Sequence, residues 1–216
     1  MEPDNLEIEV KFFLPDLPAA RRAVLALGAE SRGRVFEKNT LFDTPDRRLA
    51  RGRCLLRVRE DGRCLLTFKS PPGVEDPGFK VFVEREVEVS DARVMEAILL
   101  GLGFLPGRTY EKYRETLVLG KLKILLDETP FGDFLELEGT REDIRRAAES
   151  LGLAWEDRVT ENYLQIFAAV REAMGLSFSD PTFENFAGIA PDTRAGLDLL
   201  RKKQGFDQAD KEDERL

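Results

Sequence analysis

Charged and apolar residues alternate at a two-residue period in several segments of this chain. In the first of them, residues 6–12, the charged positions are Glu7, Glu9 and Lys11, and the other positions are apolar. Side chains of a β-strand point alternately to its two faces, so this period predicts a strand with one charged face and one apolar face. One such strand is uninformative, but the arrangement returns several times further along the chain.

Eight segments in all have the composition and period of strands. They cover residues 6–12, 34–43, 55–59, 64–69, 81–89, 110–119, 122–127 and 134–138. Turn residues at Asp61-Gly62 and Gly120 predict hairpins, which favours antiparallel pairing. Helices are predicted at residues 16–28, 90–103, 140–152, 160–175 (beginning at a Thr160 cap) and 192–203. These elements place the chain in the α+β class.

The charged positions of these strands are nearly all ionic, whereas a solvent-facing surface usually mixes in Thr, Ser and Gln. The cations are Lys11, Arg57, Arg59, Lys69, Lys112 and Arg114, with Lys123 as a weaker member. The anions are Glu7, Glu9, Glu84, Glu86, Glu88, Asp127, Glu136 and Glu138. Like charges also cluster on single strands, where neighbours repel. An open sheet with its charged face in water is one interpretation of this pattern.

The interpretation that we favour turns the charged face inward. Eight antiparallel strands can close into a barrel whose interior holds side chains or one small ligand. The predicted fold is therefore a closed eight-stranded antiparallel β-barrel, a tunnel with a polar charged interior and with helices packed on its apolar outside. Buried positive charge without a partner is costly, so the cations favour a polyanion such as a phosphate chain. The carboxylates favour hard cations, Mg²⁺ or Mn²⁺.

Length and composition limit the classes of protein that fit. With 216 residues and 42% hydrophobic content, the chain suits one domain, expected at residues 1–175, and a C-terminal extension at residues 176–216, partly helical with a charged end. No apolar run approaches the roughly 20 residues that span a bilayer, and the N-terminus lacks the regions of a signal peptide, so we expect a cytoplasmic location and no membrane contact. The net charge of −8 argues against a nucleic-acid partner.

The chain contains no histidine, which excludes Ser-His and Cys-His catalytic pairs and imidazole ligation of metals. Its two cysteines, Cys54 and Cys64, are expected to be reduced packing residues. Any catalysis must therefore use carboxylates, lysines, arginines or a metal ion held by oxygen ligands.

The pattern Glu7-x-Glu9-x-Lys11 resembles the signature of the CYTH superfamily, the triphosphate tunnel metalloenzymes. This superfamily includes class IV adenylyl cyclases, thiamine triphosphatases and inorganic tripolyphosphatases. Later elements resemble the family in the same order: Phe42-Asp43-Thr44, Leu55-x-Arg57-x-Arg59, Thr67-x-Lys69, Arg85-Glu86-x-Glu88, Lys112-x-Arg114, Leu126-Asp127 and Gly132-x-Phe134-x-Glu136-x-Glu138-Gly139. The resemblance extends over residues 5 to 172 and implies a closed eight-stranded tunnel. It departs at Asn39-Thr40-Leu41, where members often carry a tyrosine and an upstream glutamine.

The resemblance also implies roles for the charged residues. The triphosphate would be gripped by Lys11, Arg57, Arg59, Lys69, Lys112 and Arg114. One or two Mg²⁺ or Mn²⁺ ions would be held by Glu7, Glu9, Glu86, Glu88, Asp127, Glu136 and Glu138. Catalysis would rest on Glu7, Glu9 and Lys11, where a metal ion near Glu7 and Glu9 would lower the pKa of a water aimed at the terminal phosphorus. Each of these residues could instead form an internal salt bridge that only stabilises the barrel, above all Glu84 and Lys123.

The expected reaction is hydrolysis of a small-molecule triphosphate, first of all inorganic tripolyphosphate, because no aromatic or amide cluster stands out as a reader of a nucleobase. The second candidate is a class IV adenylyl cyclase that converts ATP to cyclic AMP, and the third is a thiamine triphosphatase. A non-catalytic sensor that binds polyphosphate or a nucleotide is a further alternative, since an ionic lining alone would serve it. The chain could act as a monomer or as a homodimer.

Overall fold

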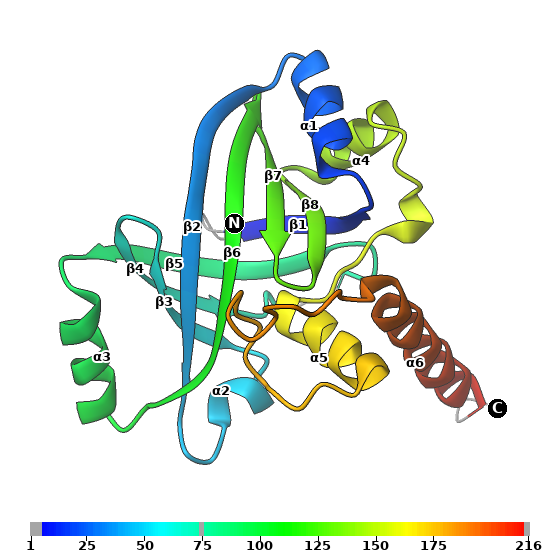
Figure 1. Ribbon diagram of the computed structural model, residues 1–216. Helices are drawn as coiled ribbons and strands as arrows, with labels where there is room; N and C mark the ends of the chain where they lie inside the picture. The colour runs from blue at the N-terminus through cyan, green and yellow to red at the C-terminus, as the bar shows by residue number, and fades with distance from the viewer. Residues whose placement is uncertain (1–5, 74–75, 214–216) are drawn as a thin grey trace.

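The computed structural model describes residues 6–73 and 76–213, and for residues 204–213 it describes the backbone alone. Residues 1–5 of the predicted domain and 214–216 of the predicted extension lie outside this range. Eight antiparallel strands form a closed barrel in the order β1-β5-β4-β3-β2-β6-β7-β8, and β8 pairs with β1 to complete the ring (Figure 1). The strands are β1 (Leu6–Leu14), β2 (Glu30–Asp43), β3 (Leu55–Glu60), β4 (Cys64–Ser70), β5 (Lys80–Val89), β6 (Leu105–Leu119), β7 (Leu122–Thr129) and β8 (Gly132–Glu138). The predicted α+β class and closed barrel are confirmed.

The register of the strands places opposite charges beside each other on neighbouring strands. Lys11 of β1 lies opposite Glu136 of β8, and Arg114 of β6 lies opposite Asp127 of β7. Directly opposed side chains on one face of an antiparallel pair are close enough to interact. The barrel therefore closes with complementary charges in register on its inner face.

Helices surround the barrel. They are α1 (Leu17–Ala26), α2 (Arg48–Arg51), α3 (Ala92–Gly101), α4 (Arg141–Ser150), α5 (Tyr163–Met174) and α6 (Thr193–Asp213), with a 3₁₀ turn at Trp155–Asp157. Asp16, Asp91 and Thr140 cap α1, α3 and α4 by accepting hydrogen bonds from backbone N–H groups three residues further on. Within the described residues, no helix is long and apolar enough to cross a membrane.

Two helix boundaries differ from the prediction. The cap of α5 is Asn162 and not Thr160, because the Asn162 side chain accepts from the backbone N–H of Gln165 while the Gln165 side chain accepts from that of Asn162. This reciprocal capping box fixes the first turn of the helix. Helix α6 continues to Asp213, beyond the predicted end at Lys203.

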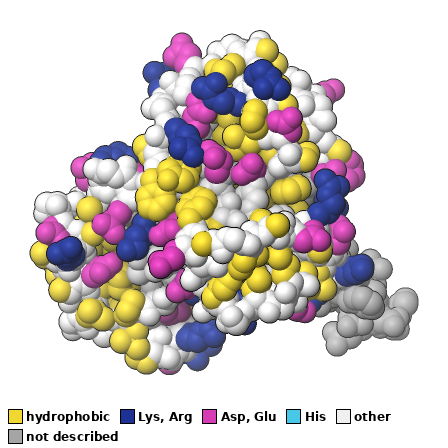
Figure 2. All heavy atoms as spheres, viewed as in Figure 1, with side chains coloured by type: hydrophobic (Ala, Val, Ile, Leu, Met, Phe, Trp, Pro, Cys, Tyr) yellow, Lys and Arg dark blue, Asp and Glu magenta, His cyan; other side chains and the backbone are white. Residues whose placement is uncertain are grey.

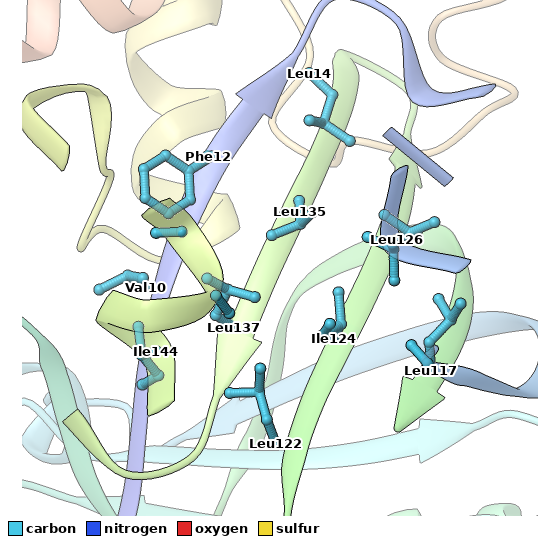
Figure 3. Close-up of a cluster of buried hydrophobic side chains, with 14 of the residues drawn as sticks. Val10, Phe12, Leu14, Leu117, Leu122, Ile124, Leu126, Leu135, Leu137 and Ile144 are labelled. Atoms are coloured by element: carbon cyan, nitrogen blue, oxygen red, sulfur yellow. The ribbon is translucent and has the colours of Figure 1, made fainter. Parts of the chain in front are cut away.

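The largest apolar core lies outside the barrel wall, between the strands and the helices that cover them. Figure 3 shows outward-facing side chains from four strands packed together with Ile144 of α4. The strand residues labelled there are Val10, Phe12, Leu14, Leu117, Leu122, Ile124, Leu126, Leu135 and Leu137. Full burial of each such side chain contributes about 1.5–3 kcal/mol. This outer core supplies the apolar packing that maintains the barrel.

A second core lies beneath α3, and a third joins α5, α6 and the turn between β7 and β8. The third core is rich in aromatic side chains and includes residues of the predicted C-terminal extension. Its buried members are Phe131, Phe134, Val159, Tyr163, Ile166, Phe167, Val170, Phe186 and Leu197. Residues 178–200 therefore pack against the barrel domain through α5.

Substitution Leu117→Ala tests the outer core. Leu117 has no exposed surface, so its truncation should lower the free energy of unfolding by about 3 kcal/mol, measured by urea unfolding followed with circular dichroism. The matched control is Leu102→Ala, where the side chain is 69% exposed and the change should stay within about 0.5 kcal/mol. Equal losses in the two variants would contradict the placement of the core outside the barrel wall.

Candidate functional site

The charged faces of the strands line the inside of the barrel. Asp127 has no exposed surface, Lys11 exposes 2% and Lys112 exposes 3%. Burial of this degree is rare for charged side chains unless each has a partner. The pairs that neutralise them form three connected groups within the ring.

The first group surrounds Lys11 of β1. Its Nζ donates to Glu9 Oε1 at 2.5 Å and lies 3.2 Å from Glu136 Oε1, while Lys80 Nζ donates to the same Glu9 oxygen at 2.6 Å. Burial alone would raise the pKa of Glu9, but Lys11 and Lys80 bring it well below its usual range. Glu9 is therefore ionised in the folded barrel at any physiological pH.

The second group surrounds Asp127 of β7. Its carboxylate accepts from Lys112 Nζ at 2.9 Å, from Arg114 Nε at 2.6 Å and from the Tyr163 hydroxyl at 2.6 Å. Arg114 also donates to Glu136 at 2.8 Å, which joins this group to the first. Burial and the Asp127 carboxylate raise the pKa of Tyr163 well above its usual value, so its hydroxyl keeps its proton and remains a donor.

The third group surrounds Lys69 of β4. Lys69 donates to Glu7 and forms an ion pair with Glu84 at 2.6 Å. Burial, together with the neighbouring Glu9 carboxylate, raises the pKa of Glu7 to about 7. Lys69 thus lies between two carboxylates, one of which has an unusually high proton affinity.

Arg57 and Arg59 of β3 are held more loosely than the other cations. Arg57 donates to the Tyr110 hydroxyl at 3.0 Å and to Thr67 Oγ1 at 3.2 Å, and both guanidinium groups lie 3.8 Å from Glu86. A separation of 3.8 Å is an ion pair without a hydrogen bond. Thr67 donates to Glu86 at 2.7 Å and so fixes this carboxylate between the two arginines. These guanidinium groups retain donors that an anion could use.

Four of the predicted residues lie nearer to solvent, namely Glu86, Glu88, Lys123 and Glu138. Lys123 and Glu138 pair at 2.6 Å, and the Lys123 side chain is 54% exposed. Glu88 is exposed on β5, near the end of that strand. The structure therefore brings most of the predicted set together in the ring, leaves the pair of Lys123 and Glu138 at its edge and leaves Glu88 apart from it.

Sequence reasoning missed three residues of the ring, namely Glu37, Asn39 and Lys80. Lys80 is four positions before Glu84, the first residue assigned to the charged face of β5, so extending the strand alternation to it would have found it. Glu37 and Asn39 gave no such signal, because both faces of β2 mix charged and apolar residues.

Glu37 and Asn39 are buried in the wall between β3 and β6. Glu37 exposes 1% and lies within 4 Å of Arg59, Lys112 and Arg114. Burial would raise the pKa of Glu37, but these cations lower it to about 2. Among the described residues, the buried side-chain polar atoms without a hydrogen-bond partner are Glu37 Oε2, Asn39 Nδ2 and Oδ1, Arg57 Nε and Arg59 Nε. All of them belong to this part of the wall, where the barrel has unused hydrogen-bonding capacity.

A cavity of about 690 Å³ opens into the ring. The side chains around it are charged, polar or aliphatic, and its lining residues are Leu6, Glu7, Arg32, Gly33, Val35, Glu37, Arg59, Asp61, Arg63, Glu84, Glu86, Arg114, Thr116, Lys123, Leu125 and Glu138. Arg32 and Arg63 are exposed at its edge, while Glu37 is deeply buried. On the outer face shown in Figure 2, charges of both signs are intermixed. The cavity thus connects the outside of the barrel with the buried ring.

The ring is close to electrical neutrality without any ligand. Its cations are Lys11, Arg57, Arg59, Lys69, Lys80, Lys112 and Arg114. Its carboxylates are Glu7, Glu9, Glu37, Glu84, Glu86, Asp127 and Glu136. The argument that the cations require an external polyanion for want of a partner is therefore wrong, because carboxylates already neutralise them. An entering anion has to exchange with these carboxylates.

The carboxylates of the ring could bind a divalent metal ion if an anion displaced them from the cations. Within the described residues, no group of three or more His, Cys, Asp or Glu side chains is arranged to hold a metal by itself. The donors available are all carboxylate oxygens, the ligands that Mg²⁺ and Mn²⁺ prefer. A phosphate chain that took the cations would free carboxylates, and the added negative charge would then favour a divalent cation. The donor set fits a metal ion that enters together with an anionic ligand.

A closed antiparallel barrel with a buried ring of paired charges defines a class of tunnel-like folds. The model of the CYTH domain matches residues 5–163, and the chain belongs to this family.

Solved structures share the fold. The PH1012 protein of Pyrococcus horikoshii is 28% identical with a TM-score of 0.62, and the match covers 73% of this chain and 96% of that one. A Vibrio parahaemolyticus protein, described as a candidate adenylate cyclase, is 22% identical with a TM-score of 0.69 and coverages of 77% and 99%. A Hippeastrum protein, described as an adenylyl cyclase candidate with a dominant triphosphatase activity, is 22% identical with a TM-score of 0.51 and coverages of 77% and 95%. No curated protein matched the sequence.

Substitution Glu37→Gln tests the charge balance of the ring. It leaves three buried cations short of counter-charge, so the free energy of unfolding of the ligand-free protein should fall by about 3 kcal/mol, measured by urea unfolding. Tripolyphosphate should raise the melting temperature of this variant more than that of the wild type, because the anion replaces the lost charge. Glu60→Gln, at the exposed end of β3, is the matched control and should change neither value. A Glu37→Gln variant that behaves like this control would refute the assigned role.

Proposed function

We propose that this protein is a divalent-metal-dependent hydrolase of a triphosphate, with inorganic tripolyphosphate as its first substrate. The observation that carries the proposal is the buried ring of cations, each held by carboxylates that an anion can displace. Membership of the CYTH family and the named activities of structural relatives are consistent with it.

Recognition of the phosphate chain would fall to two kinds of cation. Arg57, Arg59 and Arg114 present planar forks that match two phosphate oxygens at once. Lys11, Lys69 and Lys112 act as compact point charges that follow the chain. The loosely held Arg57 and Arg59 are the first that can turn toward an entering anion, because neither has a carboxylate closer than 3.7 Å.

A metal ion would be held by carboxylates that the phosphate chain releases. Glu7 and Glu84 both contact Lys69, and Glu9, two residues from Glu7 on β1, contacts Lys80. A bound Mg²⁺ or Mn²⁺ would supply Lewis-acid stabilisation of phosphate oxygens and lower the pKa of a coordinated water. Asp127 serves a different purpose in this proposal, since it orients Lys112 and Arg114 and takes the Tyr163 hydroxyl.

The composition of the cavity favours an inorganic substrate over a nucleotide. Among the described residues that line it, none is aromatic, so the cavity offers no ring on which a nucleobase or a thiazolium-pyrimidine group could stack. Adenylyl cyclase activity is the second candidate, because two structures of the same fold are described as adenylyl cyclase candidates. A non-catalytic sensor of phosphate chains would use the same cations without turnover.

One set of assays separates these functions. Phosphate release is measured from tripolyphosphate, thiamine triphosphate and ATP, each with Mg²⁺, with Mn²⁺ and with EDTA, and cyclic AMP is measured on the ATP samples. Phosphate from tripolyphosphate in a metal-dependent reaction, without cyclic AMP, is the expected result. Cyclic AMP formation would establish the cyclase instead. Tripolyphosphate binding by calorimetry with no product under any condition would establish the sensor.

Substitution Glu9→Gln tests the proposed metal ligands. The amide keeps the shape of the side chain but loses its charge, so metal-dependent phosphate release should fall by about 100-fold or more, with a higher metal concentration needed for half-maximal activity. Steady-state assays over a Mg²⁺ series measure both effects. Glu142→Gln on the exposed surface of α4 is the matched control and should retain full activity. Full metal-dependent turnover by Glu9→Gln would remove the residue from the metal site.

A further inference from the structure

Helix α5 closes one end of the barrel. Tyr163, its first residue, is 6% exposed and reaches into the ring, where its hydroxyl donates to Asp127 and its ring lies 4.7 Å from Lys112 Nζ. Phe131 and Phe134 pack edge-on against the Tyr163 ring at 6.3 and 5.4 Å. Together these side chains form an aromatic floor beneath the buried cations.

The cavity lies at the other end of the same strands. On β1 the cavity is lined by Glu7, whereas Phe13 packs against Phe134 of the floor. Six residues of strand separate these two positions, which corresponds to about 20 Å. On β8 the cavity is lined by Glu138, near the end of the strand opposite to the Phe131 turn. The ring is therefore open at the cavity and closed at α5.

The segment after α5 holds this helix in place from outside. At the start of α6, Thr193 donates to the carbonyl oxygen of Phe131 in the β7–β8 turn. Gly196 lies directly against Val170 of α5, where a Cβ atom on Gly196 would come within 2.5 Å of Val170 Cγ2 and 2.8 Å of its backbone. The close approach of the two helices therefore depends on a glycine at this position.

The chain between the two helices ties α5 to the barrel wall. Phe178 stacks on Phe167 of α5 with ring centroids 5.9 Å apart. Further along, Asp180 accepts a hydrogen bond from the backbone N–H of Thr109, and the carbonyl of Pro181 accepts one from Glu111, both residues of β6. In Figure 1 this segment runs across the face of α5 before it enters α6. Residues 178–200 therefore contact the floor helix, the β7–β8 turn and β6.

This segment lies beyond the part of the chain that the family shares. The family model ends at residue 163, and the PH1012 and Vibrio structures are matched over 96% and 99% of their own length while covering only 73% and 77% of this chain. The outer contacts on α5 thus come from residues beyond the part of the chain that the family model matches.

We propose that residues 178–200 lock α5 into the barrel, so that a phosphate chain can enter and leave only through the cavity. The lock makes the site specific for a free end of a phosphate chain. This inference rests on the proposed function only in taking a phosphate chain as the ligand. A barrel that was open at both ends could slide along a long chain, whereas a barrel with one closed end binds a linear polyphosphate at its two termini alone.

The experiment is a calorimetric titration of the full chain with linear polyphosphates of two defined lengths, about 15 and about 100 phosphates, with tripolyphosphate as the reference ligand. The buffer contains EDTA, Ca²⁺ or Mg²⁺, whichever supports tripolyphosphate binding without measurable hydrolysis during the run. We expect one protein chain per tripolyphosphate and two per polymer at either length. A ratio that grows with polymer length would overturn the proposal and leave tripolyphosphate recognition intact.

Substitution Gly196→Val tests the lock itself, since the new side chain cannot fit against Val170. Hydrogen exchange of the α5 amides should become at least about tenfold faster. The number of protein chains bound per molecule of the longer polymer should rise above two. The matched control is Gly101→Val at the end of α3, where a Cβ meets nothing within 4 Å, and it should change neither measurement. The lock would be refuted if hydrogen exchange of the α5 amides were unchanged in Gly196→Val. It would also be refuted if exchange became faster while two protein chains still bound each polymer. If tripolyphosphate does not bind at all, the proposed function fails, and the exchange rates alone decide whether the extension holds α5.

Discussion

The fold depends on the mutual neutralisation of lysines, arginines and carboxylates inside the barrel. Isolated charges in such a place would each destabilise the folded state by several kcal/mol. Here Glu9 is shared by two lysines, and Asp127 is shared by a lysine, an arginine and a tyrosine hydroxyl. Because each carboxylate serves several donors, removal of one group disturbs a whole sector of the ring. The interior is thus a cooperative network and not a set of separate ion pairs.

The location of the apolar core follows from this network. A barrel with an ionic interior cannot bury hydrophobic side chains at its centre, so the strands place their leucines, valines and phenylalanines outward, where α1 and α4 cover them. The charged side chains and the apolar core therefore lie on opposite faces of the same sheet. Ligand exchange inside the ring can therefore break and reform ion pairs while the packing that maintains the barrel stays unchanged.

Strand alternation predicted the closed barrel and the inward direction of the charges, and turn and helix-start residues predicted helices α1, α3 and α4, because these features depend on local sequence. Three other features were not predictable in this way. The partners of a given lysine depend on barrel register, which no local pattern reveals. Glu37 and Asn39 occupy a strand whose two faces are equally mixed, so their inward direction is fixed only by pairing with β3 and β6. Tyr163 enters the ring through the docking of α5, a contact between distant parts of the chain.

The charged residues at the edge of the cavity are exposed to solvent, unlike those deep inside it. Arg32 and Arg63 are exposed there, and their charges are screened by water. A replacement at either position leaves the buried network untouched, whereas a replacement of Glu9 or Arg114 needs a compensating change elsewhere. Substitutions should therefore be tolerated more readily at the rim of the barrel than at its centre. Two barrels with the same charged interior can differ in what their rims contact.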